Sequence, residues 1–79
     1  MKWKWFLNGL FMSYRCEKTF DDIVYEFRVD FKPHVLRWFL TVSDKDNPNL
    51  ILINEGPFSS KELACKRGES ITEVIPNEN

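Results

Sequence analysis

The chain is poor in the residue types that build most catalytic and metal sites. It has three glycines and one histidine among 79 residues. The glycines are not clustered, so no glycine-rich loop that could cradle a phosphate group is predicted. His34 follows Pro33 in an expected turn, and no second histidine could share a transition metal with it. We therefore expect a solvated loop histidine and no transition-metal site.

Cysteine is scarce as well. The two cysteines, Cys16 and Cys65, lie far apart in the sequence and form no CxxC pair. We expect two buried free thiols in a reducing compartment, which favours a cytoplasmic location. Lys66 and Arg67 next to Cys65 could lower its pKa, but no candidate base accompanies it as nucleophilic catalysis would require.

Long hydrophobic runs are missing. No apolar run approaches the about 20 residues that a membrane-spanning helix needs. The stretch Met1–Met12 begins like a signal peptide, but Asn8 and Gly9 interrupt it and no cleavage motif follows. An interfacial anchor with Trp at the headgroup level is one alternative, and a natural start at Met12 is another. We expect instead that the Trp-rich segment, residues 1–9, packs onto the domain.

Neither sign of charge dominates. Eleven Lys and Arg face twelve Asp and Glu, for a net charge of −1, and the two signs interleave. This balance argues against a general binder of polyanions and against an acidic mimic of DNA. Aromatic residues are plentiful, at 15% of the chain. A domain this short buries only about 60% of its extended surface, so we expect the aromatics to stabilise a small core.

Two groups of carboxylates imitate functional sites. Asp44–Asn49 together with Glu55 resembles a calcium loop, but Pro48 occupies a ligand position and Asn49 replaces the turn glycine. Strand patterns flank this segment where helices belong. Asp21–Asp22 is expected to form a turn rather than an acid–base pair. We predict no metal, no cofactor and no enzymatic activity.

The middle of the chain alternates apolar and polar residues with the period of two that strands have. Leu10–Glu17, Ile23–Phe31 and Val35–Ser43 are expected strands, with a turn at Lys32–His34. The inward residues of the second and third strands are Ile23, Tyr25, Phe27, Val29, Phe31, Leu36, Trp38, Leu40 and Val42. Their outward residues are Val24, Glu26, Arg28, Asp30, Arg37, Phe39 and Thr41. A polar hairpin loop at 44–49 and a strand at Leu50–Ile53 follow, and the continuous apolar run favours burial on both faces.

A helix start follows this last strand. Ser59 is predicted as the N-cap because its hydroxyl can accept a hydrogen bond from a free backbone N–H. Glu62 stands three residues later, where its carboxylate would complete a capping box. Phe58 and Leu63 flank the box at the positions of a hydrophobic staple.

The helix end is less sharply defined by the sequence. Ala64, Gly68, Ile71 and Ile75 have helical spacing, which predicts a helix over 59–75 that Pro76 ends. Gly68 would then mark close contact between the helix and the sheet. Alternatively, the helix ends at Gly68 and residues 71–75 form a last strand.

These elements predict one α+β domain. An antiparallel sheet of three to four strands occupies residues 10–55, one helix over 59–75 covers one of its faces, and 76–79 is a tail. Apolar residues point to both faces, so a second cover is required. We expect either the Trp-rich N-terminal segment or another chain, as in a homodimer or a complex, to supply it.

The segment 25–77 resembles the YegP-like family of small bacterial proteins of unknown function. The matching residues are Arg37 to Leu40, Leu50 to Ile53, Glu55-Gly56, Ser60-Lys61, Ala64 and Gly68. Pro57-Phe58 replaces a single tyrosine of the family pattern, the hairpin loop is longer, and Ile71 is displaced from a Gly-Ile pair. The resemblance implies a sheet assembled from two repeats, so that a chain with one repeat would dimerise. It implies no known activity.

A nucleic-acid-binding domain is an alternative. Strands followed by Ser60-Lys61 at a helix start are similar to the end of a double-stranded-RNA-binding domain, whose lysines there hold phosphates. Arg15, Arg28 and Arg37 with Phe39 could also form a stacking platform. Acidic residues among them would cancel most of the field, which favours a solvated sheet face with ion pairs.

Taken as a whole, the pattern favours a non-enzymatic module that binds protein. Its size and lack of catalytic residues suit a phage-type or mobile-element accessory protein, such as an anti-CRISPR inhibitor that blocks a larger partner. Exposed aromatic and arginine residues dominate binding hot spots. The predicted partner-binding residues are therefore the outward Trp3, Trp5, Arg28, Arg37 and Phe39.

Overall fold

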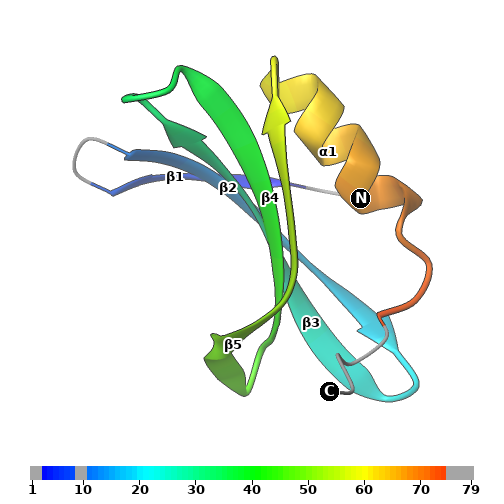
Figure 1. Cartoon of the computed structure of the whole chain (residues 1–79). Coiled ribbons are helices and arrows are strands. Elements are labelled where there is room, and N and C mark those ends of the chain that lie inside the picture. Colours follow the sequence, from blue (N-terminus) through cyan, green and yellow to red (C-terminus); the bar gives the residue numbers. More distant parts are fainter. Residues whose placement is uncertain (1–2, 9–10, 75–79) are drawn as a thin grey trace.

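The protein consists of one twisted antiparallel sheet with one helix on one of its faces (Figure 1). The computed structural model describes residues 3–8 and 11–74, with the side chains of residues 3–4 and 12–74. The elements in chain order are β1 (Lys4–Asn8), β2 (Phe11–Phe20), β3 (Ile23–Lys32), β4 (Arg37–Asp44), β5 (Asn47–Phe58) and α1 (Lys61–Ser70). The predicted α+β class and the order of strands before one helix are confirmed.

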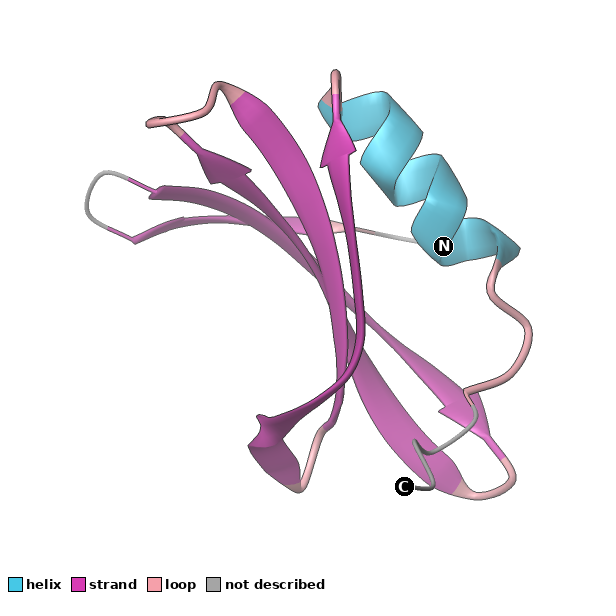
Figure 2. Ribbon diagram, in the orientation of Figure 1, coloured by secondary structure: helices cyan, strands magenta, loops and turns pink. Residues whose placement is uncertain are grey.

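Each strand pairs with the next one in the chain, so the sheet is a meander of order β1-β2-β3-β4-β5 (Figure 2). The predicted sheet, residues 10–55, is too short at both ends. Lys4–Asn8 of the Trp-rich segment adds an edge strand, with Trp5 opposite Tyr14, and β5 continues to Phe58. Tight turns connect the inner strands: Asp21 and Asp22 both have positive φ, of 50° and 65°, which confirms the predicted turn.

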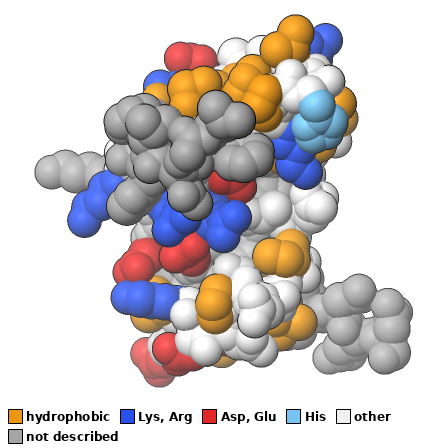
Figure 3. All heavy atoms as spheres, turned by 90° about the vertical axis from the view of Figure 1, so that its left-hand side faces the viewer, with side chains coloured by type: hydrophobic (Ala, Val, Ile, Leu, Met, Phe, Trp, Pro, Cys, Tyr) orange, Lys and Arg blue, Asp and Glu red, His pale blue; other side chains and the backbone are white. Residues whose placement is uncertain are grey.

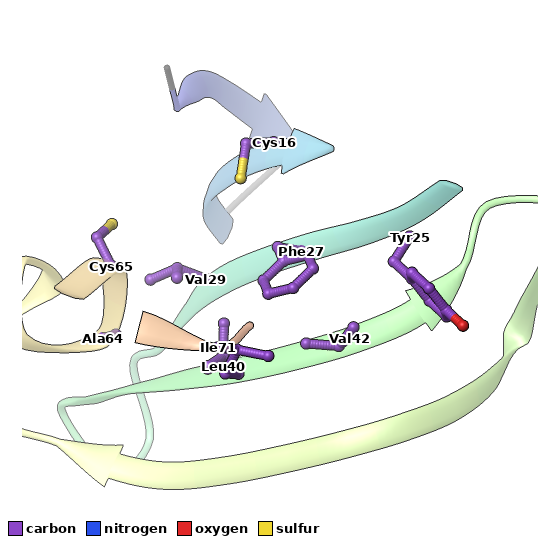
Figure 4. Packing of buried hydrophobic residues seen from close by; sticks show 9 residues of the cluster. All are labelled: Cys16, Tyr25, Phe27, Val29, Leu40, Val42, Ala64, Cys65 and Ile71. Atoms are coloured by element: carbon purple, nitrogen blue, oxygen red, sulfur yellow. The ribbon is translucent and has the colours of Figure 1, made fainter. Parts of the chain in front are cut away.

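The core lies between α1 and the sheet face that the helix covers, which we call the helix face. Tyr25, Phe27 and Val29 are buried there, as the alternation of β3 predicted. Leu40 and Val42 of β4 are fully buried beside them. Figure 4 shows these side chains in one cluster with Cys16, Ala64, Cys65 and Ile71, in which Ala64 and Cys65 of the helix lie at one end and Tyr25 at the other. Burial of side chains of this size supplies most of the stability of a small domain.

Two apolar segments differ from prediction. Leu36, expected to point inward, lies in the turn at 33–36 and is 65% exposed. Leu50–Ile53, expected to be buried on both faces, belongs to edge strand β5, where Leu50 and Ile51 are 50% and 48% exposed. The expected loop over 44–49 shrinks to a turn at Lys45–Asp46, and irregular pairing near Ser43 displaces this part of β5 from the regular ladder.

The helix begins one residue later than predicted. Ser60, not Ser59, is the N-cap: its backbone is extended and its Oγ accepts a hydrogen bond from the Leu63 N–H at 3.2 Å. The predicted capping box is therefore wrong, because Glu62 falls outside the N3 position and its carboxylate lies 3.9 Å from Lys61 Nζ. The predicted staple is also wrong. Leu63 is 50% exposed, whereas Phe58 packs against the core.

The helix ends at Ser70, so the predicted extension to residue 75 is wrong, and residues 71–74 form no strand. Ile71 has an extended backbone, and its side chain turns into the core. Lys18 of β2 stabilises this end, since its Nζ donates to the carbonyl oxygens of Gly68, Glu69 and Ile71 at 3.4, 3.2 and 2.6 Å. A cation at the carbonyl end of a helix is favourable for both hydrogen bonding and the helix dipole.

Close contact at Gly68 is confirmed. A Cβ there would lie 3.0 Å from Trp3 Cη2 and 3.4 Å from Leu40 Cδ1. A two-pronged ion pair also ties α1 to β5, with Arg67 Nε 2.7 Å and Arg67 Nη2 2.9 Å from the Glu55 carboxylate. The hydrogen bonds from Arg67 lower the pKa of Glu55, so this link persists as the pH falls through the usual carboxylate range. Among residues 3–8 and 11–74 no helix is long and apolar enough to cross a membrane.

Candidate interaction surface

The sheet face opposite α1, which we call the outer face, has no described element packed on it. The helix contacts β3, β4 and β5 from the other side. Figure 3 shows the outer side of the molecule: bands of Lys and Arg alternate with bands of Asp and Glu over its middle, and hydrophobic side chains gather at its upper end. The predicted one-sided cover is thus confirmed for the described residues.

Charged side chains of the outer face form rows that run across the strands. The register places Lys4 of β1 opposite Arg15 of β2, and Arg15 opposite Arg28 of β3. We call these three residues the cationic row. Glu17 of β2 lies opposite Glu26 of β3, two positions along each strand from Arg15 and Arg28. We call this pair the acidic row.

One residue of each row also forms an ion pair with a residue that lies outside the two rows. Arg28 Nη2 lies 3.5 Å from Asp30 Oδ2, and Lys45 Nζ lies 3.1 Å from Glu17 Oε2. The Glu26 side chain is half-buried, and its carboxylate forms no hydrogen bond or ion pair with another described side chain. The outer face therefore carries balanced charge that is ordered in rows.

A second feature lies at the end of the sheet where β3 turns into β4. Val35, Leu36, Arg37 and Phe39, here called the turn patch, combine apolar side chains with one arginine. Leu36 has φ 55°, and its N–H donates to the carbonyl of Lys32 at 2.9 Å. Arg37 Nη1 donates to the Leu36 carbonyl at 3.0 Å. Positive φ is uncommon outside glycine and costs a residue such as leucine about 1 kcal/mol or more.

Phe39 anchors the turn patch to the sheet. Its ring is partly buried and closes over Gly56, where a Cβ would lie 2.6 Å from Phe39 Cδ1. The Lys32 ammonium lies 4.4 Å from the centroid of the same ring, within cation–π range. The ring is thus held in place and presents its remaining surface on the outer face.

The predicted site residues divide into three groups. Arg28, Arg37 and Phe39 lie on the outer face, as the alternation of β3 and β4 predicted. Trp3, predicted to point outward, packs instead at the helix face. Trp5 belongs to β1, but its side chain lies outside the described residues. The alternation predicts a strand over Val35–Ser43 with Leu36 inward, whereas residues 33–36 form a turn that exposes Val35 and Leu36.

Trp3 has a structural environment. Its ring lies against Gly68 of α1, and its Nε1–H donates to Glu69 Oε2 at 3.0 Å. The expected packing of the N-terminal segment is therefore confirmed at Trp3, but on the helix face. Trp3 therefore does not cover the outer face, which was one of the two expectations for the N-terminal segment.

Both cysteines are free and buried in the core, as predicted. Burial raises the pKa of the Cys16 thiol to about 12 and also raises the pKa of the Cys65 thiol. The pKa of Cys65 is raised and not lowered, because desolvation outweighs the nearby Lys61 ammonium. His34 is exposed in the turn, and no three His, Cys, Asp or Glu of the described chain lie together as metal ligands.

We expect neither thiol to react appreciably with Ellman's reagent at neutral pH while the protein is folded. The thiolate is the reactive species, and a raised pKa leaves almost none of it. Absorbance of the released thionitrobenzoate measures the reaction, and the same protein in denaturant is the control in which both thiols should react. A fast-reacting thiol in the folded protein would contradict the burial of Cys16 and Cys65.

Lys61, the residue that suggested phosphate binding, is engaged within the chain. Its Nζ lies 4.5 Å from the Tyr14 ring centroid and 3.9 Å from Glu62 Oε1. Both contacts hold the ammonium near the helix start, beside an acidic group. This geometry does not favour the double-stranded-RNA-binding alternative.

Comparison of the chain with family models, curated proteins and solved structures finds no match.

Proposed function

We propose that this chain is a non-enzymatic protein-binding module that docks on a larger partner through the turn patch. The observation that carries the proposal is Leu36, a large apolar residue that is 65% exposed at a φ of 55°. Neither property stabilises the folded chain. Residues kept in costly conformations at exposed positions occur preferentially at binding sites.

The neighbours of Leu36 suit a binding hot spot. Val35 is 45% exposed, Arg37 supplies a guanidinium, and Phe39 is a fixed aromatic ring at the edge of the patch. Arginine and aromatic residues contribute most binding energy in protein interfaces, with apolar groups around them to exclude water. A domain of this size would act by occupying a surface of its partner, as an accessory protein or an inhibitor of the anti-CRISPR kind does. The YegP-like resemblance stays a prediction.

Leu36→Asn tests this function, because the fold and the binding should respond in opposite directions. Asparagine tolerates positive φ better than leucine, so the free energy of unfolding should rise by up to about 1 kcal/mol. Loss of the exposed apolar side chain should abolish capture of the partner. Urea denaturation measures the first effect, and affinity capture from the source cell, with the variant as bait, measures the second.

Leu63→Asn is the matched control, since Leu63 is also apolar and 50% exposed but lies on α1. It should leave capture unchanged. Capture that survives Leu36→Asn, or fails equally with Leu63→Asn, would refute the role of the turn patch. Captured nucleic acid released steeply by salt would support the alternative instead.

A further inference from the structure

The rows of the outer face break the usual rule for pairing charges in a sheet. Like charges directly opposite on neighbouring strands destabilise a sheet, whereas opposite charges stabilise it. Here Arg15 faces Arg28, and Glu17 faces Glu26. Exchanging the charges of Arg28 and Glu26 would make both cross-strand pairs opposite in charge, but it would remove the ion pair of Arg28 with Asp30.

The same order makes the outer face complementary to itself. The cationic and acidic rows are parallel neighbours, about 7 Å apart, because one lies two positions from the other along each strand. A half-turn about an axis that lies between the rows and runs parallel to them exchanges their positions. A second copy placed face to face by this rotation would set each cationic row over the acidic row of the other copy.

Other kinds of partner fit this arrangement less well. A nucleic acid attracted by the cationic row would meet the acidic row and Asp30 on either side of it. A strongly basic protein attracted by the acidic row would meet the cationic row beside it. The Glu26 carboxylate is half-buried and has no ion pair among described residues, so a cation that arrives from outside would give it one. A second copy supplies that cation as Arg28.

We propose that the outer face binds a second copy of the chain on a two-fold axis, with Arg28 of each copy over Glu26 of the other. Closed two-fold dimers of this kind use one patch twice, so each charge complementarity counts twice. Within the turn patch, Val35 and Leu36 lie in the turn, beyond the row of Asp30 and Phe39. Leu36 is therefore separate from Arg28 and Glu26, and the substitutions that test self-association and partner docking can fail separately.

Charge reversal provides the test. Arg28→Glu alone and Glu26→Arg alone each place like charges across the two-fold axis, so each should raise the dissociation constant of the dimer by about a hundredfold or more. An equimolar mixture of the two variants should restore association as a heterodimer, because the reversed side chains then face each other. The double variant Arg28→Glu/Glu26→Arg should dimerise again by itself. Sedimentation equilibrium over a range of protein concentrations measures all four cases.

Lys66→Glu is the control, since Lys66 is exposed on α1 and should leave the dimer unchanged. Far-ultraviolet circular dichroism establishes that each variant is folded. If a single variant does not fold, the double variant still tests the proposal, because it carries one positive and one negative charge at these two positions, as the wild type does. A wild-type chain that stays monomeric at every concentration, or a mixture that stays monomeric, would overturn the proposal. Leu36→Asn should dimerise normally, which separates this result from failure of the proposed function.

Discussion

Replacing Gly56 with alanine will lower the free energy of unfolding by about 3 kcal/mol. Gly56 has a φ of 145°, a backbone conformation that residues with a side chain rarely adopt. A Cβ there would also lie 2.6 Å from Phe39 Cδ1 and 3.1 Å from the Trp38 carbonyl oxygen. The ring would have to leave its place over the strand, while the backbone oxygen cannot yield. Urea denaturation followed by circular dichroism measures the loss.

Gly68→Ala is the informative comparison for Gly56→Ala. It should stay within about 1 kcal/mol of wild type, because alanine gains helix propensity that offsets the crowding of Trp3. The contacts support this difference, since the nearest atoms, at 3.0 and 3.1 Å, belong to the end of the Trp3 ring rather than to backbone. Equal losses from the two substitutions would show that backbone conformation at Gly56 is not the cause.

Lys18→Met will lower the free energy of unfolding by about 2 to 3 kcal/mol. Methionine keeps the aliphatic part of the side chain but removes the ammonium group. Three carbonyl groups at the end of α1, those of Gly68, Glu69 and Ile71, then lose their donor. The cation–π contacts of Nζ with Phe20 and Phe27, at 5.5 and 5.4 Å from the ring centroids, are lost as well.

Urea denaturation and hydrogen exchange of the amides near Ile71 check this result. The exchange should accelerate most at the helix end, where the chain leaves α1 and enters the core. Lys66→Met is the control, because Lys66 is exposed on α1. This substitution should change the free energy of unfolding by less than about 0.5 kcal/mol. A Lys18→Met variant as stable as this control would show that water replaces the ammonium without cost.

The fold could be predicted best where the pattern of apolar residues is compatible with only one buried face. In β3, strict alternation with large apolar residues at every second position permits only one buried face, and Tyr25, Phe27 and Val29 occupy it. The same alternation identified Arg28 and, in β4, Arg37 and Phe39 as outer-face residues. A shift of one residue would have exposed the whole apolar set, so the register is strongly determined.

Prediction failed where neighbouring residues were chemically equivalent. Ser59 and Ser60 can both cap a helix, and only the backbone of the folded chain selects Ser60. Ile71 satisfies the helical spacing, yet it reaches the core from an extended backbone because Lys18 stabilises the end of the helix at Ser70. Asn8 and Gly9 are predicted to interrupt the apolar stretch, whereas Lys4–Asn8 forms strand β1, with Asn8 opposite Phe11.

By itself, the sequence determined the α+β class, the buried face of the central strands and the absence of clustered catalytic or metal-ligating motifs. These properties depend on local periodicity and composition, which act between residues close in the chain. The tertiary structure alone decided the alignment of Lys4, Arg15 and Arg28 in one row, the exposure of Leu36 and the placement of Trp3 on α1. Each of these depends on which strands become neighbours and where a turn falls, and such long-range pairings leave no trace in the spacing of residues along the chain.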